Sequence, residues 1–531
     1  MPRGVEVQLF DDAGVALSSL TDLQVVWLDV PEVKDFADFT GTASAMTTDG
    51  TGWLRVDLEG FSGLSVGGVG FLLVYKKNVS DFKDSLIFAS EMTVATITSG
   101  QSLSVPNDWV RPSDWLTLPT LTTGEQKFVG LLAIRETTNF VALTASGNFV
   151  VNWGDGSGDI NVNAGVQAER NIAWADVSSS TLTSLGYRQV IVTVTMQAGQ
   201  TMTSFSLQRK HTQAGLIANP TTNWLDISVN APSMTTLEIR NGTTVTGLRN
   251  LAVARVQENA VTNFSNLFNS CTGLRSLPIL TTGSGTNFSG MFSLCTGLQA
   301  VPLFDTAAGT NFGSMFNSCG NLRAIPLINT AAGTNFSIMF GSCARLLTVP
   351  LLATGAGTNF SNMFTGCANL RAVPLINTAA GTDFNNMFNN CAALRTIPLL
   401  NTAAGTDFSN MFGSCFSLQE IPLLNTGAGL NFNNIFSGCQ SLQAVPQLNT
   451  ASGTSFSGPF AGSVSIAKAR FNGTTRSIFY PNLALSAEAL NDIYTGLGTA
   501  AGAQTINVSN NWGVAADDPT IATAKGWTVT G

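Results

Sequence analysis

The sequence is poor in charge and contains almost no histidine. Only 11% of its 531 residues are charged, and His211 is the single histidine. A chain with one histidine and no CxxC motif lacks the usual zinc ligands, so we expect His211 to be an ordinary surface residue. The net charge is −8 and no basic cluster occurs, which argues against a nucleic-acid partner. The low charge also predicts that much of the surface is covered in an assembly.

Long apolar runs are missing as well. The longest, residues 64–75, is glycine-rich and well short of the roughly 20 residues that a membrane span needs. Residues 1–8 alternate between polar and apolar side chains and contain no apolar signal core. We therefore expect neither membrane insertion nor a signal peptide.

Cysteine is absent from most of the chain, and where it occurs it recurs every 24 residues. Phenylalanine, leucine and proline keep the same step, as in Phe264, Phe268, Cys271, Leu274 and Pro278. Strict self-similarity at this period is the signature of a solenoid. The eight cysteines occupy positions 271, 295, 319, 343, 367, 391, 415 and 439.

Each 24-residue unit predicts one coil built from a short helical turn and a short parallel strand. Phenylalanines at i and i+4 share one face of a helical turn, and the L-x-x-L-x-L run at Leu370, Val373 and Leu375 is typical of a strand. One coil buries too little apolar surface to offset the entropy of ordering its backbone. Coils must therefore stack, about 4.8 Å apart, with each phenylalanine against the next.

This stacking also predicts the state of the repeated polar and sulfur-bearing residues. Cysteines in a ladder point the same way, which suits a disulfide poorly, so we expect small buried hydrophobic residues. Asn-Phe-Ser at 263, 287, 335 and 359 matches the glycosylation acceptor pattern. Because its phenylalanine belongs to the expected core, we interpret it as a turn cap.

Two β-rich regions precede the array. Strand-like runs at 5–10, 23–30, 53–58, 69–75 and 86–96 predict an N-terminal β-sandwich over residues 1–103, followed by a linker over 104–122. Runs within 128–134, 149–153 and 189–207 predict a second β-sandwich over 123–222.

The array itself is expected over residues 263–461, between two caps. A degenerate repeat over 223–262 predicts the N-terminal cap, and 462–531 the C-terminal cap. In the latter, Ser486 is expected to cap a helix over 487–497, and residues 519–525 to form a second helical turn that Gly526 ends.

Asp155 lies among glycines at the end of a strand of the second β-region, in the sequence Trp-Gly-Asp-Gly-Ser. Such a carboxylate can bind calcium or cap a tight hairpin turn. The composition favours the turn, and we expect no cofactor.

The repeat unit T-N-F-S-x-M-F-x-x-C-x-x-L-x-x-[VI]-P-L-L-N-T-A-A-G resembles the BspA-like leucine-rich repeats of bacterial surface proteins. Residues 111–116, 126–130 and 153–156 are similar to a domain of tailed-phage fibre proteins, and the last of these also resembles PKD-type sandwiches. These resemblances imply a mainly β phage fibre protein. N-terminal β-sandwich domains, one of them PKD-like, would be followed by a leucine-rich-repeat solenoid and an α/β C-terminal cap.

A proline recurs after the strand of each unit and raises the question of what faces solvent. If strict alternation continues through it, the proline and the residue two positions later point outward. An apolar stripe of that length is rarely left in water, so we predict an interface with neighbouring chains or another virion protein. The alternative is a different strand phase, with these residues in the core. The stripe comprises Pro302, Phe304, Pro326, Ile328, Leu352, Pro374, Ile376, Pro398, Leu400, Pro422 and Leu424.

The sequence and its resemblances together predict a structural phage protein, a virion-surface fibre or spike made in the host cytoplasm. The N-terminal domain would bind other virion proteins and the solenoid a host protein or glycan receptor, in a homo-oligomer with a trimer favoured. Arg323, Arg371, Arg395 and Gln419 vary between repeats and are candidate receptor contacts, unless they are merely solvated. Alternatives are a bacterial cell-surface adhesin and a capsid decoration protein without a receptor role. Acidic residues do not recur as the pairs a glycosidase needs, so we expect no enzyme.

Overall fold

The computed structural model divides the chain into two compact units, residues 1–103 and 104–531. In the first unit the structure describes the backbone of six strands. In the second it describes residues 109–137, 139–207, 211–212, 223–239 and 248–531. The rest of the predicted N-terminal sandwich, and residues 104–108 of the predicted linker, lie outside the described residues.

The first unit contains two three-stranded antiparallel sheets. One has the order β1-β4-β3, with β1 Gly4–Gln8, β4 Trp53–Asp57 and β3 Thr47–Thr48. The other has the order β2-β5-β6, with β2 Leu23–Asp29, β5 Val69–Lys76 and β6 Leu86–Thr93. The five strand-like runs predicted from the sequence are confirmed as strands.

The second unit begins with a β-domain whose larger sheet continues into the solenoid. Its seven strands have the order β10-β9-β12-β7-β14-β16-β17. Strand β7 pairs antiparallel with β14, whereas β14, β16 and β17 are parallel to one another, as successive coils must be. The boundary predicted at residue 222 therefore lies directly before β14, a strand that belongs to both the β-domain and the solenoid. The β-domain itself covers the first coil. The strands are β7 Lys127–Ile134, β9 Phe149–Asn152, β10 Asp159–Val162, β12 Arg188–Met196, β14 Trp224–Asn230, β16 Val253–Val256 and β17 Ser276–Leu280.

A smaller sheet completes this domain in the order β11-β8-β13-β15. Two 3-10 turns, η2 Trp174–Asp176 and η3 Ser179–Thr181, precede β12. The sheet's strands are β8 Phe140–Ala145, β11 Ala168–Asn171, β13 Ser204–Ser206 and β15 Thr236–Glu238.

A buried carboxylate ties the predicted linker to the sheet. Asp226 on β14 is fully buried and forms ion pairs with Arg111, at 2.8 Å, and with Arg255 on β16. The indole of Trp115 donates a hydrogen bond to the Tyr187 hydroxyl at 2.7 Å. Removing one partner from such a buried pair costs several kcal/mol, so the described part of the segment before residue 122 is a packed part of this domain.

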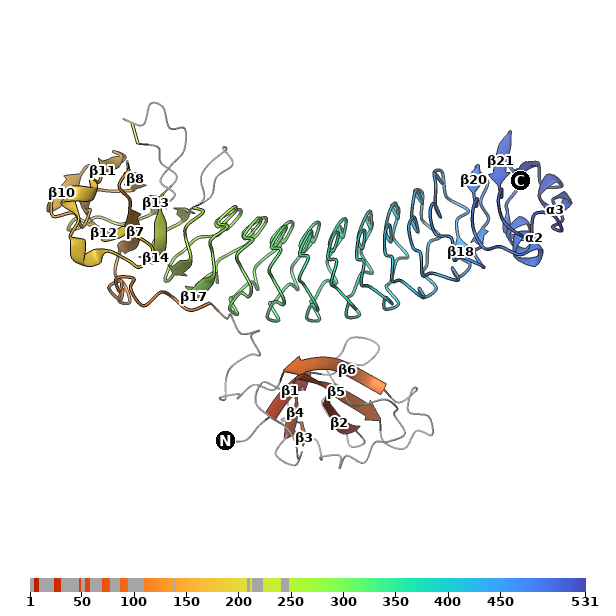
Figure 1. Cartoon of the computed structure of the whole chain (residues 1–531), viewed down its shortest axis with the longest axis horizontal. Coiled ribbons are helices and arrows are strands. Elements are labelled where there is room, and N and C mark those ends of the chain that lie inside the picture. The colour runs from red at the N-terminus through yellow and green to blue at the C-terminus, as the bar shows by residue number, and fades with distance from the viewer. Residues whose placement is uncertain are drawn as a thin grey trace. The chain divides into compact units, whose positions relative to one another are not determined.

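Residues 263–461 form a row of similar coils (Figure 1). Backbone N–H groups donate from one coil to the next, as from Phe364 to the Met387 carbonyl at 2.9 Å. Isolated parallel bridges join every coil to its neighbour, from Asn263–Asn287 to Asn431–Ser455. The fold class, a mainly β leucine-rich-repeat solenoid, is as predicted.

The local structure of the coils differs from the prediction. Within residues 263–461, all described, there is no helix, and the only strands are β17 and β18 Leu448–Asn449. The expected helical turn is a pair of tight turns whose residues include left-handed ones, such as Asn266 (φ 56°) and Ser270 (φ 62°). Asparagine and glycine, which tolerate this conformation, recur at both positions together with serine, and Leu294 and Ile338 are the exceptions. The recurrent proline has no N–H to donate to a ladder, which keeps the strands short.

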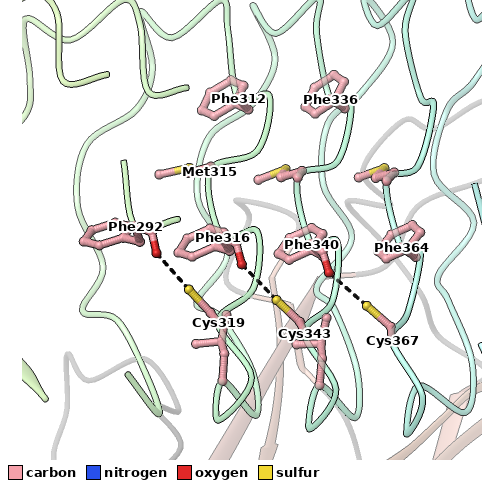
Figure 2. Close-up of a cluster of buried hydrophobic side chains, with 14 of the residues drawn as sticks. Phe292, Phe312, Met315, Phe316, Cys319, Phe336, Phe340, Cys343, Phe364 and Cys367 are labelled. Carbon is pink, nitrogen blue, oxygen red and sulfur yellow. Dashed lines mark hydrogen bonds between the residues drawn. The ribbon is translucent and has the colours of Figure 1, made fainter. Parts of the chain in front are cut away.

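Two columns of stacked phenylalanines form the core. Rings of successive coils have centroids 5.4 to 5.9 Å apart and planes within 13° of parallel. A column made mostly of methionine lies between them, as Figure 2 shows for Met315 beside Phe312 and Phe316. Every side chain of the two phenylalanine columns is buried.

The C-terminal segment covers the last coil. Phe471, on β19 Phe471–Asn472, and Tyr480 pack with ring centroids 5.0 Å from that of Phe460. A parallel sheet follows, made of β20 Ile478–Phe479, β21 Gln504–Asn507 and β22 Trp527–Thr530. Helices α2 Ala487–Gly496 and α3 Thr520–Thr523, with Gly526 at φ 84°, confirm the two predicted helical segments. No described helix has the length and apolar character of a membrane span.

Substituting Ser486 by alanine is expected to lower the free energy of unfolding by about 1 kcal/mol. The Ser486 side chain accepts the Ala489 N–H at 3.1 Å, and alanine leaves that donor without its cap. Chemical denaturation followed by circular dichroism measures the loss. Ser486→Asp, which keeps an acceptor, is the matched control and should retain most of the stability; an equal loss in both variants would contradict a capping role.

Candidate interaction surface of the solenoid

The cysteine column is internal and is not a reactive site. Cys319, Cys343 and Cys367 each donate from Sγ to the carbonyl of a phenylalanine 27 residues earlier, at 3.0 Å (Figure 2). All eight cysteines are free and buried, as predicted. Burial raises the pKa of every one of these thiols, to about 12 for Cys343. Ser463 occupies the same position in the last coil and donates to the Phe436 carbonyl at 2.5 Å.

We expect these thiols to be inert towards a thiol reagent in the folded protein. The nucleophile is the thiolate, and here the thiol is both protonated and shielded. Reaction with Ellman's reagent at neutral pH should label fewer than one cysteine per chain without denaturant, and all eight in guanidinium chloride. Rapid labelling of several cysteines in the native protein would show that the coils open.

The repeated Asn-Phe-Ser segments are turn caps, as predicted. The Oδ1 atoms of Asn263, Asn287, Asn335 and Asn359 each accept the N–H two residues later, at 2.9 to 3.0 Å. Asn287, Asn335 and Asn359 are half-buried beside the phenylalanine column. Asn263, in the first coil of the array, is exposed. Their side chains hold the tight turns in place.

The predicted interface stripe is wrong for all its non-proline members. Phe304, Ile328, Leu352, Ile376, Leu400 and Leu424 are at most 5% exposed and belong to the core. Of the stripe's prolines, Pro326 is buried, whereas Pro302, Pro374, Pro398 and Pro422 are half-buried.

The error lies in the assumption of strict alternation. The chain turns at the proline, as where the Ile376 N–H donates to the Pro374 carbonyl at 2.8 Å. The residue after the proline therefore lies outside, and the core residues are Val373 and Ile376, three apart rather than two.

A different apolar column faces solvent. It consists of the leucine that directly follows the proline in six successive coils, and these side chains are 41 to 62% exposed. We call this set the leucine column: Leu303, Leu327, Leu351, Leu375, Leu399 and Leu423. Sequence reasoning missed this column. The signal was present, because leucine follows proline in six successive units of the repeat.

Two mostly polar columns flank the leucine column along the chain. Four residues before each leucine lies a position that includes the predicted receptor contacts; of these Arg371, Arg395 and Gln419 are exposed and Arg323 is half-buried. Two residues after each leucine lies an exposed position that is most often asparagine, as at Asn377. The structure thus brings the four predicted contacts together in one line beside the leucine column.

Asp155 forms the predicted turn. Its Oδ1 accepts the Ser157 N–H at 3.0 Å and the Ser157 hydroxyl at 2.6 Å, and its Oδ2 pairs with Arg170. Burial by itself raises the pKa of Asp155, but the hydrogen bonds from Ser157 and the Arg170 guanidinium outweigh it and lower that pKa. Within the described ranges, no three histidine, cysteine or acidic residues converge as metal ligands.

His211 does not lie on the surface as predicted. Its side chain is 8% exposed, and its ring packs on Phe140 with centroids 4.7 Å apart. The imidazole therefore contributes to the packing of the β-domain.

The three aspartate side chains of the array also act in turns. Asp305, Asp383 and Asp407 each accept, through Oδ1, the N–H of the residue two positions later, at 2.8 to 3.0 Å. Asp383 and Asp407 replace the asparagine of the turn cap in their coils. This arrangement provides backbone support rather than a pair of carboxylates that flank a cleft.

The repeat and its stacked coils define the class of protein, a leucine-rich-repeat solenoid. Residues 243–349 and 358–472 match a family described as Mycoplasma protein of unknown function, DUF285. No curated protein matches the chain.

Two solved structures of similar proteins are the TLR13–ssRNA13 complex and the plant peptide hormone receptor RGFR1 in complex with RGF2. The first is 17% identical with a TM-score of 0.22 over 54% of this chain and 43% of that one. The second is 13% identical with a TM-score of 0.20 over 54% of this chain and 51% of that one. This chain therefore spans about half the length of either receptor chain, or less.

Proposed function

We propose that this chain is a non-enzymatic attachment protein, a fibre or spike on the surface of a phage particle whose solenoid contacts the host surface. The observation that carries the proposal is the regular surface of the coils. Exposed columns repeat the same side chains in coil after coil, while the cysteines and phenylalanines are all internal. A surface of this kind suits a repetitive receptor, because many weak contacts add to one strong attachment.

The absence of enzymatic activity is part of this proposal. The thiols are protonated and buried, and the acidic residues at 305, 383 and 407 hold turns. A hydrolase of surface glycans would need two carboxyl groups that flank a substrate. The side chains that the solenoid offers instead are arginine, glutamine, asparagine and leucine, which suit binding.

The parts of the chain have different roles in this proposal. Residues 1–103 bind other virion proteins, the PKD-like β-domain over 123–222 connects them to the solenoid, and the solenoid projects towards the host. The receptor, a protein or a glycan, contacts Arg323, Arg371, Arg395 and Gln419. These side chains share one line of the surface, and their spacing of one or two coils matches a ligand with repeated acceptor groups.

A bacterial cell-surface adhesin is the second candidate. The observation that favours it is the match of the array to a family whose description names Mycoplasma. An adhesin would use the same surface of the coils but display it on a cell. A capsid decoration protein without a receptor role is a further alternative for the virion.

Labelling experiments decide where the protein lies. Antibodies against residues 263–461, coupled to gold, should label particles released by the organism that encodes the chain, at the tail or the capsid. Label on cells and none on particles would instead support the adhesin.

Receptor binding is tested with the fluorescent full-length chain on host cells. Arg371→Ala with Arg395→Ala should reduce cell binding at least tenfold. Lys468→Ala with Arg476→Ala removes the same charge from exposed positions of the C-terminal cap and is the matched control. Equal losses in both double variants would show that net charge, and not the arginine positions, governs binding.

A further inference from the structure

We propose that the leucine column is the contact surface between copies of this chain, which associate in parallel about an axis along the solenoid. Six leucines, each 41 to 62% exposed, follow one another without interruption from the coil of Leu303 to that of Leu423. Soluble monomers rarely leave a contiguous apolar surface of this length in water. This proposal applies to a fibre and to an adhesin alike, and so does not depend on the proposed function.

The spacing of the leucines identifies the occupant. Equivalent phenylalanine rings of successive coils lie 5.4 to 5.9 Å apart, whereas side chains on one face of an extended peptide recur about every 6.6 Å. Over the six leucines, an extended peptide laid along the column would fall out of step with it by about one coil. A second solenoid with the same coil keeps step with all six leucines, and another copy of this chain provides it.

The flanking columns identify the orientation. Consider a parallel assembly about an axis along the solenoid. The flanking column on one side of the leucines in one copy then faces the flanking column on the opposite side of the leucines in the next copy. The arginines at 323, 371 and 395 would then face asparagines such as Asn377. The amide oxygen of Asn377 accepts the Ala379 N–H of its own turn at 3.1 Å and has a second lone pair that can accept from a guanidinium, so the pair is complementary. An antiparallel pair would bring arginine against arginine.

The residues of the two flanking columns also change together from one coil to the next. Leu347 is the one apolar residue in the first column, and the same coil holds Ala353 in place of the asparagine. The coil of Arg371 has Asn377 and that of Gln419 has Asn425. In a parallel assembly in register, Leu347 of one copy would face Ala353 of the next, and polar residues would face each other in the coils of Arg371 and Gln419.

Light scattering of the full-length chain tests the association. The expected mass is two or three times 55.7 kDa, since either cyclic assembly places the leucines at the axis. Leu351→Asp, Leu375→Asp and Leu399→Asp together should give a monomer, with the dissociation constant raised at least tenfold. Leu294→Asp, Phe416→Asp and Leu430→Asp alter side chains outside the column that are 43 to 45% exposed and should leave the mass unchanged. A monomeric parent, or a control triple variant that dissociates as fully as the first, overturns the proposal.

Disulfide trapping tests the orientation. The native cysteines are buried, so a cysteine introduced at the surface is the one that oxidises. Leu303→Cys alone should form a disulfide-linked oligomer on mild oxidation, because parallel copies in register bring each Leu303 position to its own counterpart. A link that forms only when Leu303→Cys is mixed with Leu423→Cys would show antiparallel pairing and contradict the inference.

Discussion

Raising the pH above about 9 is expected to unfold the solenoid cooperatively, because eight buried thiols cannot ionise in place. The ordinary thiol pKa is 9.0, and burial raises it to about 12 for Cys271, Cys343 and Cys415 and well above 9.0 for the others. Between these values the unfolded chain has lost protons that the folded chain retains, so stability falls as pH rises. Below about pH 8 both states are protonated and the thiols cause little pH dependence.

The expected magnitude is large. A proton bound in one state alone changes the free energy of unfolding by about 1.4 kcal/mol per pH unit, so eight thiols together have removed about 11 kcal/mol, relative to neutral pH, by one unit above their ordinary pKa. This is comparable to the whole stability of a typical domain. Circular dichroism between pH 8 and about 11 should therefore show a steep transition.

A variant with fewer thiols separates this cause from other alkaline effects. Cys319→Ser, Cys367→Ser and Cys415→Ser together leave five thiols, so the slope of unfolding free energy against pH should fall by about three eighths. Serine is a suitable replacement because Ser463 already occupies this column and donates to the Phe436 carbonyl. An unchanged slope would mean that other groups, such as the buried Tyr480 hydroxyl, dominate.

The 24-residue period made the solenoid and its core predictable. A residue type that recurs at one position of every coil must be in a similar environment in each of them, so phenylalanine and cysteine could be assigned to the interior without a structure. The asparagine turn caps followed from the same argument. Local hydrogen bonding likewise made Asp155 and the Ser486 cap recognisable, since each involves residues two or three positions apart.

The period could not give the direction of each side chain. Alternation fails at the proline, and that shifts the exposed column by one residue, from Ile376 to Leu375. Propensity favoured a helical turn around Phe264 and Phe268, whereas the left-handed residues at 266 and 270 produce tight turns. The shared sheet of the β-domain and the first coil depends on the pairing of β7 with β14, almost a hundred residues apart, which no local pattern reveals.

Substituting Phe388 by alanine is expected to lower the free energy of unfolding by about 3 to 5 kcal/mol. The ring is fully buried and stacks between Phe364 and Phe412, with centroids 5.6 and 5.8 Å away. Its neighbours cannot close the cavity, because hydrogen bonds between coils fix their backbones. The Phe388 N–H itself donates to the Met411 carbonyl at 2.9 Å. Denaturation with guanidinium chloride measures the change.

Phe416→Ala is the matched control, since Phe416 lies in the next coil but is 43% exposed. Its loss should stay near 0.5 kcal/mol, the usual range for a surface substitution. The cavity at position 388 has a further consequence, because each coil of a solenoid is stabilised chiefly by its two neighbours. A break in the middle of the stack should uncouple the two halves and broaden the transition of Phe388→Ala relative to the parent. Equal losses in the two variants would contradict this account, because the stability would then not depend on the stacked column.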